Sequence, residues 1–124
     1  MTVTYKQLVD AANAVVPKIS GQEAQEMHAN GALIVDVHDS AELAQTGKIA
    51  GALHIPRGSI EMKADLTAAS ADQNFAHDRP VIVHCAGGGR AALAGKAVKD
   101  MGYAKVYNLG GFKDWVAAGG KVEK

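Results

Sequence analysis

A lone cysteine, Cys85, is followed by three glycines and an arginine, and this arrangement is suited to nucleophilic chemistry. It comes directly after a predicted buried strand and directly before a predicted helix. A glycine-rich turn at such a place can point several backbone N–H groups into one concavity, and the helix start adds the positive end of its dipole. Both effects favour the thiolate, the reactive form of cysteine. The residues of this predicted anion cradle are Ala86, Gly87, Gly88, Gly89 and Arg90.

Two other interpretations of the loop are weaker. A lone cysteine is often only a small buried side chain, but such a residue needs neither the glycines nor the helix start. Residues 87–92 also fit the spacing of dinucleotide-binding turns, but two glycines follow Leu109, where that motif expects an acidic residue. We therefore interpret Cys85 as a nucleophile. Arg90 then supplies a fixed positive charge whose planar fork suits a sulfonate or sulfite oxygen.

Three charged residues elsewhere are candidates to support this loop. Asp36 ends another predicted strand, and the carboxyl ends of parallel strands share one rim of a sheet, so it can anchor the loop amides or Arg90. Glu42 is a candidate partner for Arg90. Arg57 is a candidate for binding an anionic donor. An ordinary solvated charge is an equally good interpretation of each.

Histidine chemistry is not expected at this site. His84 precedes the cysteine, but neighbouring residues of a strand point to opposite faces of the sheet, so it is not expected to act as a base for Cys85. The five histidines show no spacing typical of metal ligands. The sequence therefore predicts neither a metal site nor a resident cofactor.

Strands and helices alternate along the chain, which predicts an α/β fold with a largely parallel sheet. Short apolar runs predict strands, amphipathic segments predict helices, and the polar stretch 59–79 predicts helical turns and loop. The predicted strands are residues 32–37, 52–55, 80–84 and 105–109, and the predicted helices are residues 4–16, 20–30, 41–45, 90–101 and 112–118.

Size and charge narrow the class of protein. A chain of 124 residues favours one domain. Lys plus Arg number 13, as do Asp plus Glu, so the net charge indicates neither nucleic acid nor an anionic membrane as partner. No apolar run is long enough to span a bilayer, and the first residues do not resemble a secretion signal, so a cytoplasmic location is expected.

Four segments resemble, in order, the motifs of the single-domain rhodaneses, a family of sulfurtransferases. Cys85 to Arg90 matches the active-loop pattern C-x-x-G-x-R at every patterned position. Residues 35–42, 47–58 and 107–115 are similar to the segments D-V-R-x-x-x-E, G-H-I-x-G-A-x-x-I-P and L-x-G-G-x-x-x-W. Two positions depart from these patterns: His38 replaces the usual arginine and Lys48 the usual histidine.

The resemblance implies both a fold and a reaction. The fold is a three-layer, rhodanese-like domain over residues 17–124, with a central, largely parallel five-stranded sheet flanked by helices. Residues 1–16 would be a helical extension packed on that core. The reaction moves a sulfane sulfur from a small donor such as thiosulfate, through a persulfide on Cys85, to cyanide or a thiol, including a protein thiol. The persulfide takes the place of a cofactor.

Two alternative functions need the same kind of loop. A persulfide carrier or sulfur sensor that serves a protein partner would use an identical cradle. A small cysteine-dependent phosphatase or arsenate reductase would normally have the spacing C-x5-R. Cys85 and Arg90 have the spacing C-x4-R, which predicts a cradle too small for phosphate around the thiolate.

Overall fold

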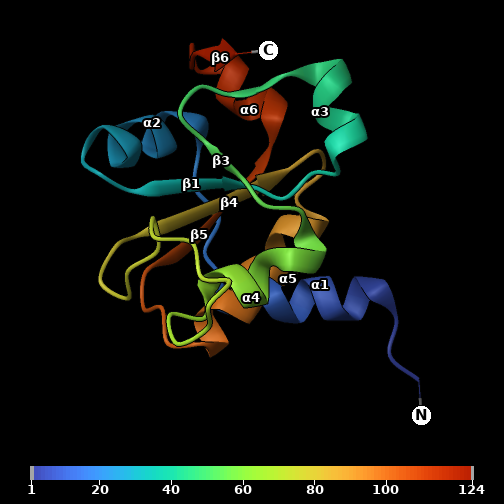
Figure 1. The fold of residues 1–124 in the computed structure, drawn as a ribbon. Coiled ribbons are helices and arrows are strands. Elements are labelled where there is room, and N and C mark those ends of the chain that lie inside the picture. Colours follow the sequence, from blue (N-terminus) through green and yellow to red (C-terminus); the bar gives the residue numbers. More distant parts are fainter. Residues whose placement is uncertain (1, 124) are drawn as a thin grey trace.

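Four parallel strands form the central sheet of the computed structural model, which describes residues 2–123 (Figure 1). Every residue of the two middle strands, β1 and β4, is buried, as their continuous apolar runs predict. The spatial order is β3–β1–β4–β5, so the carboxyl ends of all four strands lie at one rim. The strands are β1 Leu33–Asp36, β3 Leu53–His54, β4 Val81–Cys85 and β5 Val106–Gly111.

Helices cover both faces of this sheet (Figure 1). One face packs against α4 and α5, and the other against α2 and α6. The first helix, α1, packs mainly against α5. No helix within residues 2–123 combines the length and hydropathy needed to cross a membrane. The helices are α1 Tyr5–Val15, α2 Gly21–Ala29, α3 Ser40–Thr46, α4 Ile60–Ala64, α5 Gly89–Asp100 and α6 Phe112–Ala117, with a 3-10 turn, η1, at Arg57–Ser59.

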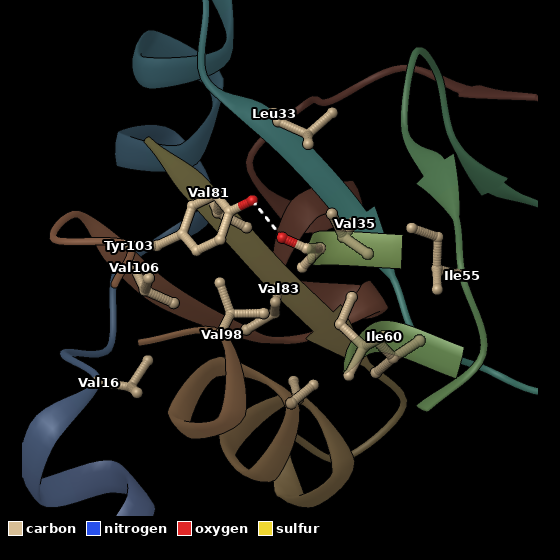
Figure 2. Packing of buried hydrophobic residues seen from close by; sticks show 14 of the residues in the cluster. Val16, Leu33, Val35, Ile55, Ile60, Val81, Val83, Val98, Tyr103 and Val106 are labelled. Atoms are coloured by element: carbon tan, nitrogen blue, oxygen red, sulfur yellow. Dashed lines mark hydrogen bonds between the residues drawn. The ribbon is translucent and has the colours of Figure 1, made fainter. Parts of the chain in front are cut away.

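The side chains that alternate along the strands divide the core into two clusters. Figure 2 shows the cluster on the α5 side, where Val35 and Val83 of the sheet face Val98 of α5. Tyr103 closes this cluster, and its hydroxyl donates a hydrogen bond of 2.7 Å to the carbonyl of Ala64. This packing fixes the start of α5 against the end of β4, where the glycine loop lies.

The main sheet has four strands rather than the expected five. The fifth position holds a single bridge, in which Lys18 lies beside Asn108 at the outer edge of β5. Pairing cannot continue past this point, because Ser20 already caps α2 with its side chain on the Glu23 amide. Two short strands not predicted from the sequence, β2 Lys48–Ile49 and β6 Val122–Glu123, form a separate antiparallel pair.

Candidate active site

Cys85 is the last residue of β4, and its side chain is only 1% exposed. The backbone N–H of Gly88 donates a hydrogen bond to its Sγ atom at 3.0 Å. Gly88 is also the N-cap of α5 and has a φ of 93°, a left-handed conformation that favours glycine. The sulfur atom therefore lies against a loop amide at the N-terminal, positive end of a twelve-residue helix.

The three glycines of the loop have different surroundings. A Cβ atom on Gly88 would lie 3.3 Å from the Cα of Gly110, whereas one on Gly87 would have no atom within 4 Å. A Cβ atom on Gly89 would overlap the hydroxyl of Tyr5, and one on Gly111 would lie 2.7 Å from the carbonyl oxygen of Ala86. The loop is thus confined by α1 on one side and by the end of β5 on the other. Of its three glycines, Gly87 is the one at which a side chain would meet no neighbouring atom.

Arg90 and Glu42 form a two-pronged ion pair. Arg90 Nη1 lies 2.6 Å from Glu42 Oε1, and Nη2 lies 3.0 Å from Oε2. The hydrogen bonds from Arg90 and then that from the Asp39 backbone N–H lower the pKa of Glu42 to about 2, while the same pair raises the pKa of Arg90. Arg90 therefore joins the start of α5 to α3, with both terminal amino groups of its fork on one carboxylate.

Asp36 lies at the predicted rim but does not anchor the loop or Arg90. Its Oδ1 atom accepts a hydrogen bond from the backbone N–H of His38 at 2.9 Å and lies 2.7 Å from the Nδ1 atom of the same residue. Its Oδ2 atom lies 3.5 Å from His84 Nε2. The physical reason is the strand register. Asp36 is paired with His84, on the face of the sheet opposite to Cys85, so its carboxylate is directed into the protein.

Asp36, His38 and His84 form a buried group that the sequence spacing did not reveal. Their potential ligand atoms lie within 4.8 Å of one another, so these are the residues of the described chain that could hold a metal ion. The closest pair in the group is the hydrogen-bonded His38–Asp36 pair. Asp36 Oδ2 and both ring nitrogens of His84 have no hydrogen-bond partner within residues 2–123.

Acidification is expected to destabilise the fold through His84. Burial lowers the pKa of His84 to about 4; Asp36 opposes this shift and His38 adds to it. Below about pH 6.5 the unfolded chain binds a proton at this histidine that the folded chain does not. The free energy of unfolding therefore decreases as the pH is lowered. The loss should approach about 2 kcal/mol between about pH 7 and pH 5.

Denaturant unfolding at a series of pH values measures this slope. His84→Gln should flatten it over that interval, whereas His77→Gln, at an exposed histidine, should leave it unchanged. A wild-type slope in His84→Gln would contradict the assignment.

Arg57 is not brought to the cysteine. Its Nη1 atom pairs with Glu61 Oε1 at 2.9 Å across one turn of helix. It lines a separate hollow between η1, α1 and α5, which also contains Leu8 and Leu93. Arg57 is not among the residues that line the hollow with Cys85, so this geometry does not support the interpretation of Arg57 as a binder of the anionic donor, which stays a prediction.

A hollow of about 370 Å³ opens above Cys85 and the glycine loop. Its far wall is α1, which the sequence analysis did not connect with the site. The lining residues are Tyr5, Val9, Asn13, Lys18, Cys85, Gly87, Gly88, Gly89 and Arg90. A neighbouring hollow of about 500 Å³ shares Lys18 and Gly87 with it.

Asn108 joins α1, the loop and β5 by hydrogen bonds, although it was not among the predicted site residues. It is fully buried, and its Nδ2 atom lies 3.2 Å from Asn13 Oδ1 and 3.2 Å from the Gly88 carbonyl oxygen. Its Oδ1 atom accepts a hydrogen bond from the Gly110 backbone N–H at 2.7 Å. The signal in the sequence was a polar residue inside the apolar run of β5.

Comparisons with known proteins connect this geometry with sulfur chemistry. A family model described as Rhodanese-like domain matches residues 20–118. The thiosulfate sulfurtransferase GlpE of Ectopseudomonas mendocina is 36% identical over 104 residues, which cover 81% of this chain and 84% of that protein.

Two solved structures share the fold. A protein of unknown function from Rhodopseudomonas palustris, described as a possible tyrosine phosphatase, superposes with a TM-score of 0.89 at 35% identity, covering 99% of this chain and 96% of that one. The polysulfide-sulfur transferase homodimer of Wolinella succinogenes superposes with a TM-score of 0.71 at 32% identity, covering 93% and 83% of the two chains.

Proposed function

The chain belongs to the rhodanese-like domain family and is a sulfurtransferase, and from this premise we propose that it takes the sulfane sulfur of thiosulfate onto Cys85. The observation that carries this proposal is the hydrogen bond of 3.0 Å from the Gly88 amide to the Cys85 sulfur atom. An amide donor at that distance stabilises the thiolate and any anionic sulfur that replaces it.

The first half-reaction forms one S–S bond and breaks another. The Cys85 thiolate attacks the outer sulfur of thiosulfate, and the bonding pair of the thiosulfate S–S bond leaves with sulfite. No proton and no external electron is needed. The product is a persulfide whose terminal sulfur lies in the cradle of residues 86–90, close to the amides at the start of α5.

The second half-reaction regenerates the thiolate. A nucleophile such as cyanide or a thiolate attacks the terminal sulfur of the persulfide, and the S–S bond pair returns to Cys85. We propose that the persulfide is the sole carrier between the two steps and that no metal or organic cofactor takes part. Arg90 holds the cradle in place through its ion pair with Glu42.

Phosphate-ester hydrolysis is the second candidate, because one structural neighbour is described as a possible tyrosine phosphatase. Two observations favour sulfur transfer. The loop has one residue fewer than the phosphatase pattern C-x5-R. In addition, both terminal amino groups of Arg90 are hydrogen-bonded to Glu42, whereas a phosphatase needs such a fork for the oxygens of its substrate.

Intact-mass measurement after thiosulfate treatment tests the proposal. Protein dialysed against EDTA is expected to gain one sulfur atom, which cyanide then removes as thiocyanate. Because the chain has one cysteine, the site of the gain is unambiguous. No gain of sulfur, together with turnover of a phosphate ester, would favour the phosphatase. A gain that requires added metal would contradict the metal-free mechanism.

A further inference from the structure

The hollow above Cys85 is lined by a second cationic residue besides Arg90, namely Lys18. The positive charge of Arg90 is balanced by Glu42, whose carboxylate takes both terminal amino groups. Lys18 is exposed and belongs to no ion pair among residues 2–123. It is therefore the residue lining this hollow whose positive charge is available to a ligand.

The backbone on both sides of Lys18 is held against β5. The Asn108 backbone N–H donates to the Pro17 carbonyl oxygen at 2.9 Å, and the Ile19 backbone N–H donates to the Asn108 carbonyl oxygen at 3.0 Å. The side chain of the same Asn108 binds the Gly88 carbonyl oxygen. Lys18 and the sulfur cradle are thus fixed to one buried residue, so the base of the lysine side chain has a defined position relative to Cys85.

Electrostatics gives this lysine a role. A donor such as thiosulfate carries two negative charges and must approach a thiolate, so two anions meet in one hollow. The two anions repel each other, and a cation that lies between or beside them offsets this repulsion. The helix start and the Gly88 amide act on the sulfur atom, and they leave the distant oxyanion end of the donor without a counter-charge.

We propose that Lys18 is the donor-binding cation of this site, which pairs with the oxyanion end of small thiosulfonate-type donors while their outer sulfur faces Cys85. This inference rests on the proposed function and adds to it the residue that binds the anionic end of the donor. Tyr5 and Asn13 of α1 are further polar residues that line the hollow.

Alkylation of Cys85 tests the role of Lys18 without any sulfur transfer. Iodoacetate and iodoacetamide react at the same thiolate, and they differ in that iodoacetate carries a negative charge. We expect Lys18→Gln to lower the ratio of the iodoacetate rate to the iodoacetamide rate about fivefold, the scale of one partly screened charge pair. Lys18→Arg should keep the ratio.

Lys105→Gln is the matched control, because it removes the same charge from the opposite end of β5 and should not change the ratio. An unchanged ratio in Lys18→Gln, or an equal drop in Lys105→Gln, would overturn the proposal.

Steady-state kinetics then separates donor from acceptor. In a ping-pong reaction, Lys18→Gln should lower kcat/KM for thiosulfate about fivefold and leave kcat/KM for an uncharged thiol acceptor unchanged. An equal loss in both constants would overturn the role in donor binding. If the wild-type protein forms no persulfide, the proposed function fails, and the alkylation ratio still decides whether Lys18 attracts anions to Cys85.

Discussion

Cys85→Ser is expected to reduce sulfur transfer from thiosulfate to cyanide to the background rate, a loss of more than about a thousandfold. A serine hydroxyl cannot form a persulfide, and no other cysteine is present to replace it. Thiocyanate production measures the rate. Intact mass after thiosulfate treatment should show no added sulfur in this variant.

The folded structure should survive this replacement, because serine is smaller than cysteine and fits the same position at the end of β4. Its hydroxyl can still accept the hydrogen bond from the Gly88 amide. Unfolding of Cys85→Ser should therefore remain cooperative, which separates loss of the nucleophile from loss of the fold. Residual thiocyanate production above the uncatalysed rate would show that Cys85 is not the sulfur carrier.

Gly88→Ala is expected to have the next largest effect, a fall in kcat/KM for thiosulfate on the order of a hundredfold. An alanine at a φ of 93° costs about 1–2 kcal/mol, and its methyl group would crowd the Cα of Gly110. Relaxing either strain turns the amide that now donates to the Cys85 sulfur atom. The cradle would then lose its main donor even where the protein stays folded.

Gly87→Ala is the matched control within the same loop. Its φ is not in the left-handed region, and a Cβ atom there would meet nothing within 4 Å. This variant should keep its stability, and its loss of kcat/KM should be clearly smaller than that of Gly88→Ala. Equal losses of kcat/KM in the two variants would mean that the loop tolerates no side chain at either glycine, and that the positive φ of Gly88 is not the reason for its effect.

The local chemistry of the chain could be predicted because it depends on residues close in sequence. The apolar runs predicted as strands 32–37 and 80–84 correspond to the buried strands β1 and β4, and the predicted helix 20–30 corresponds to α2, which Ser20 caps. Glu42 and Arg90 are 48 residues apart, and the structure joins these two candidate partners in an ion pair.

What could not be predicted depends on side-chain direction and on contacts between distant segments. Asp36 was placed at the correct rim, but its carboxylate is directed to the histidine side of the sheet, because its strand register pairs it with His84. The β2–β6 pair consists of two residues on each strand, too short for any alternation of apolar and polar side chains to reveal. Arg57 forms an ion pair with Glu61, a residue four positions away in the sequence, which the sequence analysis did not consider.

The position of α1 has a consequence for how donor preference can change. The hollow's far wall, formed by Tyr5, Val9 and Asn13, and the cation Lys18 all precede residue 20, where the family match begins. The residues proposed to select the donor therefore precede residue 20, whereas the residues that carry the sulfur chemistry lie in the cysteine loop, in a separate segment of the chain. Substitutions before residue 20, by natural variation or directed evolution, can therefore adapt the hollow to a bulkier or uncharged donor without any change in the cysteine loop.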